Sequence, residues 1–297
     1  MDTSVLSGID TGVPRHVSET RRVLRIVFSR AMVVFGMLVL LLFAVTAIFG
    51  PLFAPYNPNK QNLSGVLLAP SGEHLLGTDY LGRDTLSRLI YGARSSIMVG
   101  VVALAIAATI GIIAGLLAGY YGSWVESIIM RIIDALMSFP MMLLALLLAG
   151  LLGGGLKNVM IALGIALIPG YARLMCGQVL SIKEKDFMLA GRSLGSTHSR
   201  QMFRHILPNA MPPLLVLMTM QIGTAILAEA GLSYLGIGIT PPTASWGSMV
   251  NDGFKYLLTN PLLSVVPGLA IMLVVFAFNM VGDGLMDAID PRLRGTF

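Results

Sequence analysis

The sequence predicts an all-α polytopic membrane protein with six transmembrane helices. Of its 297 residues, 55 % are hydrophobic and only 12 % are charged, and the mean hydropathy is +0.80. Soluble domains contain about 25 % charged residues, roughly twice this share. Six apolar segments are also long enough to cross a hydrocarbon core of about 30 Å. The low charge and these long apolar segments exclude an ordinary soluble domain.

The N-terminal part predicts a cytoplasmic segment, one transmembrane helix and a polar loop. Residues 1–30 are polar and end in a cluster of arginines between residues 21 and 30. The uncharged residues 31–53 form the first predicted span, and the prolines that follow end the helix. We therefore assign residues 1–30 to the cytoplasm and residues 31–93 to the first span with an extracytoplasmic loop. The first apolar run begins too late and extends too far for a cleavable signal peptide.

Residues 94–287 are predicted to contain the other five spans, followed by a cytoplasmic tail at residues 288–297. The second span is predicted from Ser95 to about Gly119, after a short amphipathic helix near residues 81–90. Small residues repeated on one helix face allow a neighbouring helix to approach closely. The second span has such a repeat at four-residue intervals: Gly111, Gly115 and Gly119.

Prolines mark the remaining predicted spans. The third begins near Glu126 and continues to about Leu152, and Pro140 is expected to kink it. Arg131 and Asp134 stand at i and i+3 near its start, where they are expected to pair. The last three spans are predicted at residues 158–179, broken at Pro169-Gly170, at residues 211–235, with Pro212 and Pro213 in the first turn, and at residues 262–285.

The basic residues predict the orientation of the chain. With six spans and the N-terminus inside, fourteen of the 20 Lys and Arg residues fall on the cytoplasmic side. The other six fall outside: Lys60, Arg83, Arg88, Arg94, Lys157 and Lys255. This asymmetry satisfies the positive-inside rule. Both termini and the segment at residues 183–210 are therefore expected in the cytoplasm.

That segment, residues 183–210, is a polar and basic interruption of the apolar sequence. Apolar residues recur at helical spacing over residues 187–194, which predicts a short helix with a small apolar face. Gly195 suits the left-handed position that ends a helix, and Ser196 or Thr197 can cap a second one. Charge and pattern alone also fit an ordinary cytoplasmic loop. A helix–glycine corner–helix instead suits a surface that a soluble partner grips.

A second polar string, GTDYLGRD, contains Asp79, Arg83 and Asp84. Its carboxylates suggest a metal site, but no histidine stands at ligand spacing, so this interpretation is disfavoured. Aspartates in such strings commonly stabilise turns by bonding their own backbone. We interpret Asp79 and Asp84 as turn-forming and helix-capping residues with arginine partners.

Three further acidic residues stand near the ends of predicted spans. Glu229 lies about 27 Å along the fifth span at 1.5 Å per residue, near the outer interface. It is expected to be solvated there or to pair with an outer arginine. Asp283 and Asp287 lie four residues apart at the end of the sixth span. Helix capping and surface pairing with Arg292 or Arg294 are expected for them.

Four strings, in this order, resemble those of the second (C-type) permease of dipeptide/oligopeptide/nickel ABC importers. They are GTDYLGRDTLSRLIYGAR, DFMLAGRSLGSTHSRQMFRHILPN, AEAGLSYLGIG and GDGLMDAIDPRLRG. The second resembles the EAA loop of importer permeases, with Leu189 in place of the Glu and Gly191 in place of the second Ala. The resemblance assigns ATPase coupling to Asp186, Phe187, Ala190, Gly191, Arg192, Gly195, Ser196, Leu207 and Pro208.

The resemblance implies a type I importer transmembrane fold and a heterodimer with a second, homologous permease. It further implies two cytoplasmic ATP-binding subunits, an extracytoplasmic solute-binding protein, and multi-pass insertion in the lipid bilayer of a bacterial or archaeal cytoplasmic membrane. ATP and Mg²⁺ belong to the partner subunits, because this chain contains no GxxxxGK[ST] motif. No cofactor, metal or nucleic acid is expected on the chain itself. Gate or structural roles are expected for Glu229, Asp79, Arg83, Asp84, Asp283 and Asp287.

The expected function is that of a non-enzymatic permease subunit that translocates di- and oligopeptides by alternating access. Nickel or metallophore complexes and glutathione remain alternative substrates, because the binding protein sets most of the selectivity in this family. An ion-gradient-driven transporter is a less favoured alternative. It needs ion sites at broken helices near the midplane, where only Pro169-Gly170 and Arg173 stand. A membrane-embedded enzyme is disfavoured because the sequence has no plausible nucleophile–base pair.

Overall fold

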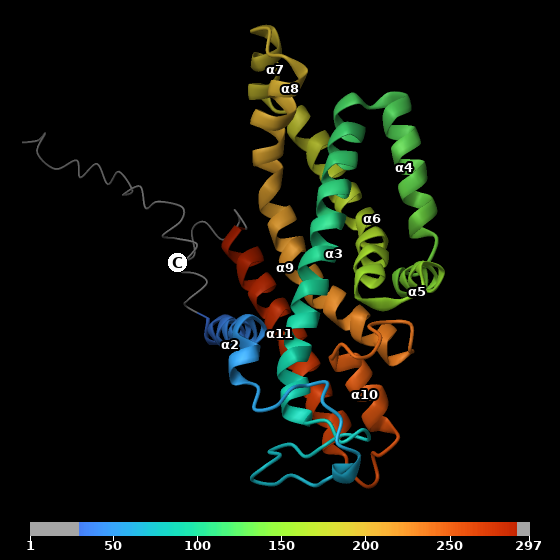
Figure 1. Cartoon of the computed structure of the whole chain (residues 1–297). Coiled ribbons are helices and arrows are strands. Elements are labelled where there is room, and N and C mark those ends of the chain that lie inside the picture. Colours follow the sequence, from blue (N-terminus) through green and yellow to red (C-terminus); the bar gives the residue numbers. More distant parts are fainter. Residues whose placement is uncertain (1–29, 290–297) are drawn as a thin grey trace, which may run out of the picture.

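The computed structural model describes residues 30–289, which form helices and loops without a β-strand (Figure 1). The short helices α7 and α8 project at one end of the bundle, and α10 lies near the other. The helices are α2 (Ala31–Phe53), α3 (Thr85–Tyr121), α4 (Ser123–Met137), α5 (Met141–Leu152), α6 (Gly155–Lys183), α7 (Asp186–Ser193), α8 (His198–Arg200), α9 (Leu207–Tyr234), α10 (Trp246–Phe254) and α11 (Leu262–Ile289). Two short turns complete them: the 3₁₀ turn Leu63–Gly65 and the π-helical turn Gln201–Ile206.

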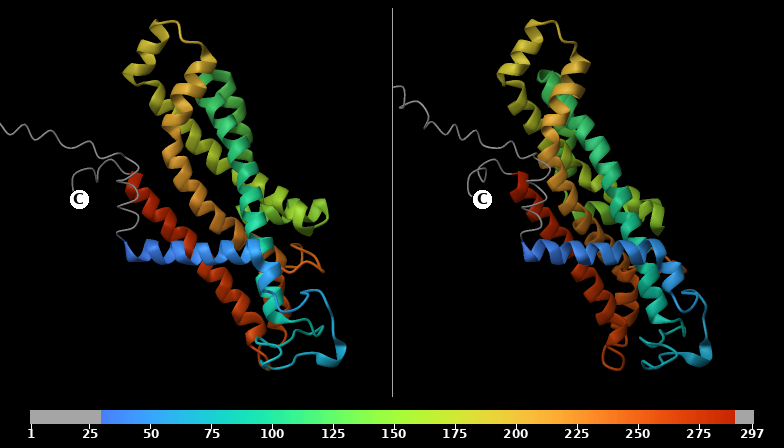
Figure 2. Two further views of the ribbon diagram at one scale, coloured as in Figure 1. Left: turned by 60° about the vertical axis from the view of Figure 1, so that its left-hand side comes forward. Right: turned by 90° about the vertical axis from the view of Figure 1, so that its left-hand side faces the viewer.

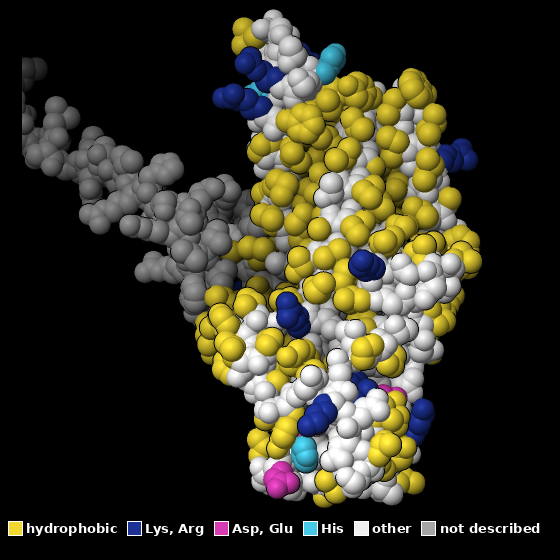
Figure 3. All heavy atoms as spheres, viewed as in Figure 1, with side chains coloured by type: hydrophobic (Ala, Val, Ile, Leu, Met, Phe, Trp, Pro, Cys, Tyr) yellow, Lys and Arg dark blue, Asp and Glu magenta, His cyan; other side chains and the backbone are white. Residues whose placement is uncertain are grey.

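The predicted polytopic all-α fold is confirmed. In the described range, five helical segments are long and apolar enough to cross a membrane, and the bent pair α4–α5 gives a sixth candidate. In Figure 3 hydrophobic side chains cover most of the upper half and the middle of this face, whereas Lys and Arg lie at the α7–α8 end and again over the lower half. This distribution suits a bundle whose apolar part lies in lipid and whose two ends lie in water.

The first turns of α3 correct one prediction. The short amphipathic helix expected before the second span is part of that span, because α3 runs without interruption from Thr85 to Tyr121. Asp84 caps it, since its carboxylate accepts a 2.7 Å hydrogen bond from the Ser87 amide. No proline occurs within α3, so nothing ends the helix at the membrane boundary.

The third predicted span is broken rather than kinked. Helices α4 and α5 meet at 88°, with Ser138, Phe139 and Pro140 between them. Pro140 has no amide proton to continue the α4 ladder, so α5 begins as a new helix. The expected Arg131–Asp134 pair is also wrong. Asp134 instead lies 2.5 Å from Arg173 of α6, atom Oδ1 to Nη2.

Three prolines lie inside continuous helices, at positions where a helix break or a helix start was expected. Helix α6 is continuous through Pro169, because a proline removes only one ladder bond and the neighbouring helices hold the rest. Pro212 and Pro213 lie inside α9 rather than in its first turn. The helix starts earlier because α8, the π-helical turn and α9 form one rod, His198–Tyr234.

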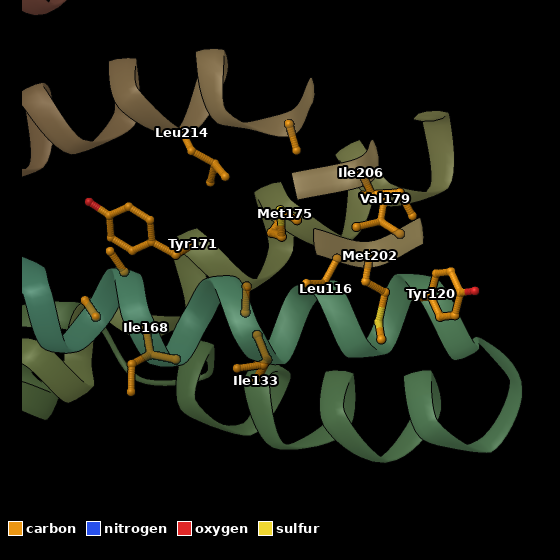
Figure 4. Packing of buried hydrophobic residues seen from close by; sticks show 14 of the residues in the cluster. Leu116, Tyr120, Ile133, Ile168, Tyr171, Met175, Val179, Met202, Ile206 and Leu214 are labelled. Atoms are coloured by element: carbon orange, nitrogen blue, oxygen red, sulfur yellow. The ribbon is translucent and has the colours of Figure 1, made fainter. Parts of the chain in front are cut away.

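Helices α3 and α6 pack along much of their length, as the glycine repeat predicts. A Cβ atom on Gly115 would lie 2.3 Å from the Ala172 carbonyl oxygen, so only glycine allows this approach. Beside the repeat, a cluster of buried side chains joins α3, α4, α6 and α9 (Figure 4). Its labelled members include Leu116, Ile133, Met175 and Leu214. Close packing of this kind holds helices together in lipid, where the hydrophobic effect does not.

Replacing Gly115 with leucine is expected to lower stability by roughly 1–3 kcal/mol, the usual cost of overpacking. The new side chain collides with the backbone of α6, which cannot move aside as a flexible side chain could. Thermal unfolding of the protein in detergent measures the loss. Gly150→Leu is the matched control, because a Cβ there meets nothing within 4 Å. Equal stability of the two variants would contradict the packing argument.

Helix α2 crosses α11 and contacts α3 (Figure 2). At its start Arg30 forms an ion pair with Asp287 near the end of α11. The predicted partners Arg292 and Arg294 lie outside the described residues, so pairing with them stays a prediction. Asp283 is exposed and makes no ion pair among the described residues.

Candidate coupling site

Helix α7 and the corner after it have the predicted form. The acidic residue Asp186 lies in the first turn and Arg192 in the last, each at the end that favours its charge. The Ser196 amide donates to the Gly191 carbonyl, and the Gly195 amide donates to the Arg192 carbonyl, both at 3.0 Å. These two bonds are the Schellman pattern that ends helices at a left-handed residue.

Gly195 is that left-handed residue, with a φ of +75°. A Cβ atom there would meet nothing within 4 Å, so the requirement for glycine comes from the backbone conformation and not from crowding. In L-residues with a side chain this conformation costs roughly 1–2 kcal/mol. The corner directs the chain from α7 into α8.

The expected side-chain cap of the second helix, by Ser196 or Thr197, is not formed. Thr197 occupies the N-cap position but its side chain makes no capping hydrogen bond. The Ser196 hydroxyl is buried without a partner in the described part of the chain. The Gln201 side-chain amide instead donates to the Ser196 carbonyl at 3.1 Å. A residue one turn further along therefore stabilises the corner.

Tyr120, at the end of α3, anchors this segment. Its hydroxyl donates to the Gln201 side-chain oxygen at 3.1 Å and lies 2.7 Å from His198 Nδ1. Lys183 Nζ donates to the Tyr120 carbonyl at 2.8 Å. Sequence reasoning missed these four residues, because Tyr120 stands far from the segment in the chain. The anchor joins the projecting corner to one of the bundle's longest helices.

The outer surface of the segment is both apolar and basic. Met188 is 1 % exposed and fixes the inner face of α7, whereas Phe187 is 44 % and Leu194 88 % exposed. Arg192 and Arg200 are exposed beside them. Large apolar side chains so exposed at a polar tip are typical of a surface that a protein partner covers. Of the residues assigned to coupling, those from Asp186 to Ser196 form this tip, whereas Leu207 and Pro208 begin α9.

At the opposite end, Asp79 forms the predicted turn. Its Oδ1 accepts from the amides of Leu81 and Arg83, both at 2.9 Å, and its Oδ2 lies 2.6 Å from Arg83 Nε. Arg88 Nε lies 3.5 Å from the same Oδ2. Both arginines are almost fully buried, so one carboxylate compensates two buried cations. Asp84 is the α3 cap, as predicted, and its Oδ1 lies 2.8 Å from His74 Nδ1.

Helix α10 adds a second carboxylate to this charge cluster. Asp252 Oδ2 lies 3.9 Å from Arg83 Nη2. Burial raises the pKa of Asp252, an effect that Arg83 and Arg88 oppose. Burial also raises the pKa of Tyr80. The cluster thus joins the loop before α3 to α10.

Asp79→Asn is expected to loosen this loop, with a loss of about 1–3 kcal/mol for the lost charged hydrogen bonds. Asp252, at the longer distance of 3.9 Å, is then the one anionic partner that the described residues leave for the buried Arg83 guanidinium. Limited proteolysis of the loop in membranes measures the effect. Glu73→Gln, which changes an exposed acid of the same loop, is the control. Equal cleavage of both variants would show that the cluster does not hold the loop.

Glu229 is neither solvated nor paired with an arginine, so both expectations for it are wrong. It is 0 % exposed, and its Oε1 accepts from Ser233 at 2.7 Å and from Ser245 at 3.1 Å. Ser233 in turn accepts from the Ile239 amide, and Ser245 from the Ser248 amide. One carboxyl group therefore joins α9, the loop after it and the cap of α10.

This bundle, with a polar helix–corner–helix projecting from one end, has the fold of a type I ABC importer transmembrane subunit. It is similar to the inward-facing MetNI methionine ABC transporter (TM-score 0.56, 18 % identity, 69 % of this chain and 98 % of that chain). An amino acid ABC transporter with histidines is also similar (TM-score 0.52, 19 % identity, 70 % and 95 % of the chains). At these identities the likeness concerns the fold alone.

The chain belongs to the family of binding-protein-dependent transport system inner membrane components, whose model matches residues 111–295. A model of the N-terminal transmembrane domain of oligopeptide transport permease C matches residues 18–70. The protein is thus a multi-pass transport component of the cytoplasmic membrane, and the predicted family is confirmed.

Curated relatives cover most of the chain. The dipeptide transport system permease protein DppC of Alkalihalophilus pseudofirmus is 40 % identical over 278 residues, 94 % of this chain and 91 % of that protein. The oligopeptide transport system permease protein OppC of Bacillus subtilis is 42 % identical over 266 residues, 90 % and 87 % of the chains. The glutathione transport system permease protein GsiD of Escherichia coli is 43 % identical over 259 residues, 87 % and 86 % of the chains.

Proposed function

We propose that this chain is one permease subunit of an ATP-driven importer of di- and oligopeptides. The observation that carries the proposal is the exposed apolar and basic tip at residues 186–196, held rigidly by the Gly195 corner and the Tyr120 anchor. Relatives named for dipeptide and oligopeptide transport support the choice of substrate. ATP and Mg²⁺ bind the partner subunits.

The complete importer contains this chain, a second homologous permease, two ATP-binding subunits and an extracytoplasmic solute-binding protein. The α7–α8 end lies in the cytoplasm, in agreement with the basic residues there. Residues 94–287 form the transmembrane core, preceded by the first span and followed by the cytoplasmic tail. The charge cluster of Asp79, Arg83 and Asp84 lies on the extracytoplasmic side.

Coupling follows from the rigidity of the tip. An ATP-binding subunit that binds residues 183–210 moves α7 when the ATPase dimer closes. The tip cannot bend freely, because the Schellman corner and Tyr120 fix it to α3 and to the α8–α9 rod. Its motion therefore reaches the bundle, which alternates between two states of access.

Purification of the tagged chain from its host in mild detergent tests this function. We expect a second permease and P-loop proteins in the eluate, with vanadate-sensitive ATPase activity. Proteoliposomes with the binding protein should then accumulate trialanine, and glutathione uptake is measured in parallel because of the relative named for it. Elution of the chain alone, without ATPase activity, would contradict the importer. Uptake of glutathione without trialanine would contradict the peptide substrate.

A further inference from the structure

A cavity of about 410 Å³, open on one side, lies at mid-length of α6 and α9. Gly170 lies 15 residues after the start of α6 and 13 before its end. Gln221 lies 14 residues after the start of α9 and 13 before its end. At 1.5 Å per residue both are about 20 Å from the helix ends, so the cavity lies at mid-membrane depth. Its lining includes Phe139, Pro140, Pro169, Gly170, Gln221 and Thr224.

The backbone lacks ladder hydrogen bonds on two sides of this cavity. The 88° break between α4 and α5 forms one wall. Pro169, which removes one ladder bond from α6, forms another. Irregular backbone at this depth is tolerated where it is buried in protein or lines a water-filled cavity, and not where it meets lipid. The exposed break at Phe139 and Pro140 therefore faces water, a polar solute or another protein chain rather than lipid.

The amide of Gln221 points to the same conclusion. On the same helix, the hydroxyl groups of Thr219 and Thr224 donate hydrogen bonds to backbone carbonyls of the preceding turn. The Gln221 amide makes no such bond with any described residue, and an unsatisfied amide in hydrocarbon is costly. Gly170 lies directly beside it, because a Cβ there would be in van der Waals contact with Gln221 Nε2, at 3.7 Å. The amide is thus free to bind a solute.

An ion pair borders the cavity on its α7 side. Asp134 and Arg173 join α4 to α6, and their side chains are 55 % and 56 % exposed. Asp134 lies three residues before the lining residue Met137, and Arg173 lies three residues after the lining residue Gly170. Charged side chains at such depth face a water-filled space or one another rather than lipid. The lining itself contains no charged residue.

We propose that this cavity is the part of the translocation path that contacts the transported peptide, an inference that rests on the proposed function. The Gln221 amide offers a donor and an acceptor, the complement of a peptide-bond amide. Because the lining is uncharged, it binds the peptide backbone and does not select for charged side chains. Gln221 is therefore a positioning residue for the backbone of the substrate.

Accessibility of a cysteine at residue 221 tests the proposal in the complete importer. In a Cys176→Ser background, which removes the chain's single cysteine, Gln221→Cys is treated with a membrane-impermeant methanethiosulfonate during ATP turnover. Met272→Cys is the control, since Met272 is 56 % exposed at a similar depth of α11. We expect labelling at residue 221 to be at least about tenfold faster than at residue 272, and trialanine to slow it.

Each result decides one part of the proposal. Equal labelling at the two positions, or none at residue 221, would overturn the cavity as part of the path. Fast labelling that trialanine leaves unchanged, in an importer that takes up trialanine, would overturn peptide contact. Failure of the unmodified importer to take up trialanine would instead overturn the peptide function itself, independently of labelling.

Filling the cavity gives a second test. Gly170→Leu is expected to lower trialanine uptake about tenfold while the ATPase activity of the complex remains. Gly177→Leu is the matched control on the same helix, since a Cβ there meets nothing within 4 Å, and it should transport normally. Normal uptake by the Gly170→Leu variant would contradict the proposed path.

Discussion

Gly195→Val is expected to reduce uptake at least about tenfold without preventing membrane insertion. The residue has a φ of +75°, which a β-branched side chain adopts only at a cost of about 1–2 kcal/mol or more. Valine therefore shifts the corner out of its left-handed conformation and breaks the two Schellman bonds. The tip then no longer transmits motion from an ATPase subunit to the bundle.

The measurement compares uptake and ATP hydrolysis in the same proteoliposomes. We expect ATP hydrolysis to continue while substrate accumulation falls, which is uncoupling. Gly195→Asn is the matched control, because asparagine adopts the left-handed conformation more readily than valine does. It should retain most of the uptake. Normal uptake by the valine variant would refute the role of this corner in coupling.

Glu229→Leu is expected to cost about 2–6 kcal/mol of stability, since it leaves two buried hydroxyl groups without their acceptor. Ser233 and Ser245 are 3 % and 0 % exposed, so water does not replace the lost bonds. The contact between α9 and the cap of α10 is lost with them. The variant is expected to unfold at lower temperature in detergent and to accumulate poorly in membranes.

Glu229→Gln separates hydrogen bonding from the loss of the side chain. Glutamine keeps an oxygen that accepts from both serines, so its stability should stay within about 1 kcal/mol of the parent protein. The comparison uses thermal unfolding of the two purified variants. If leucine and glutamine have the same effect, the hydrogen-bond network is not what holds α9 to α10.

Features set by neighbouring residues were predictable from the sequence. The corner at Gly195 depends on a helix end and a glycine that stand next to each other in the chain. The turn at Asp79 and the cap at Asp84 involve partners within four residues. The close approach of α3 and α6 followed from a four-residue glycine repeat. Short-range chemistry sets each of these features.

Partners distant in the sequence were not predictable. Asp134 pairs with Arg173, 39 residues away, and not with the nearby Arg131. Asp287 pairs with Arg30, 257 residues away. Glu229 bonds a serine of a later loop because the fold brings that loop over α9. Spacing along a helix shows which pairs are possible, whereas the tertiary packing decides which pairs form.

Prolines show the same limit. Pro140 marks a change of direction, but its sequence position does not predict an 88° turn. Pro169 was expected to break the helix, yet α6 continues through it. The reason is that α6 packs against α3 both before and after the proline. A proline removes one hydrogen bond in each case. The surrounding helices determine whether the helix continues.

Crosslinking from the tip of the α7–α8 end tests the coupling claim most directly. A benzophenone attached to Leu194→Cys, in the Cys176→Ser background, is irradiated in the complete complex. Leu194 is 88 % exposed at the tip, and Leu258, 100 % exposed near the opposite end, carries the same probe as control. We predict a crosslink from residue 194 to a P-loop ATPase subunit and none from residue 258. A complex that contains the ATPase but gives no crosslink from residue 194 would contradict the account.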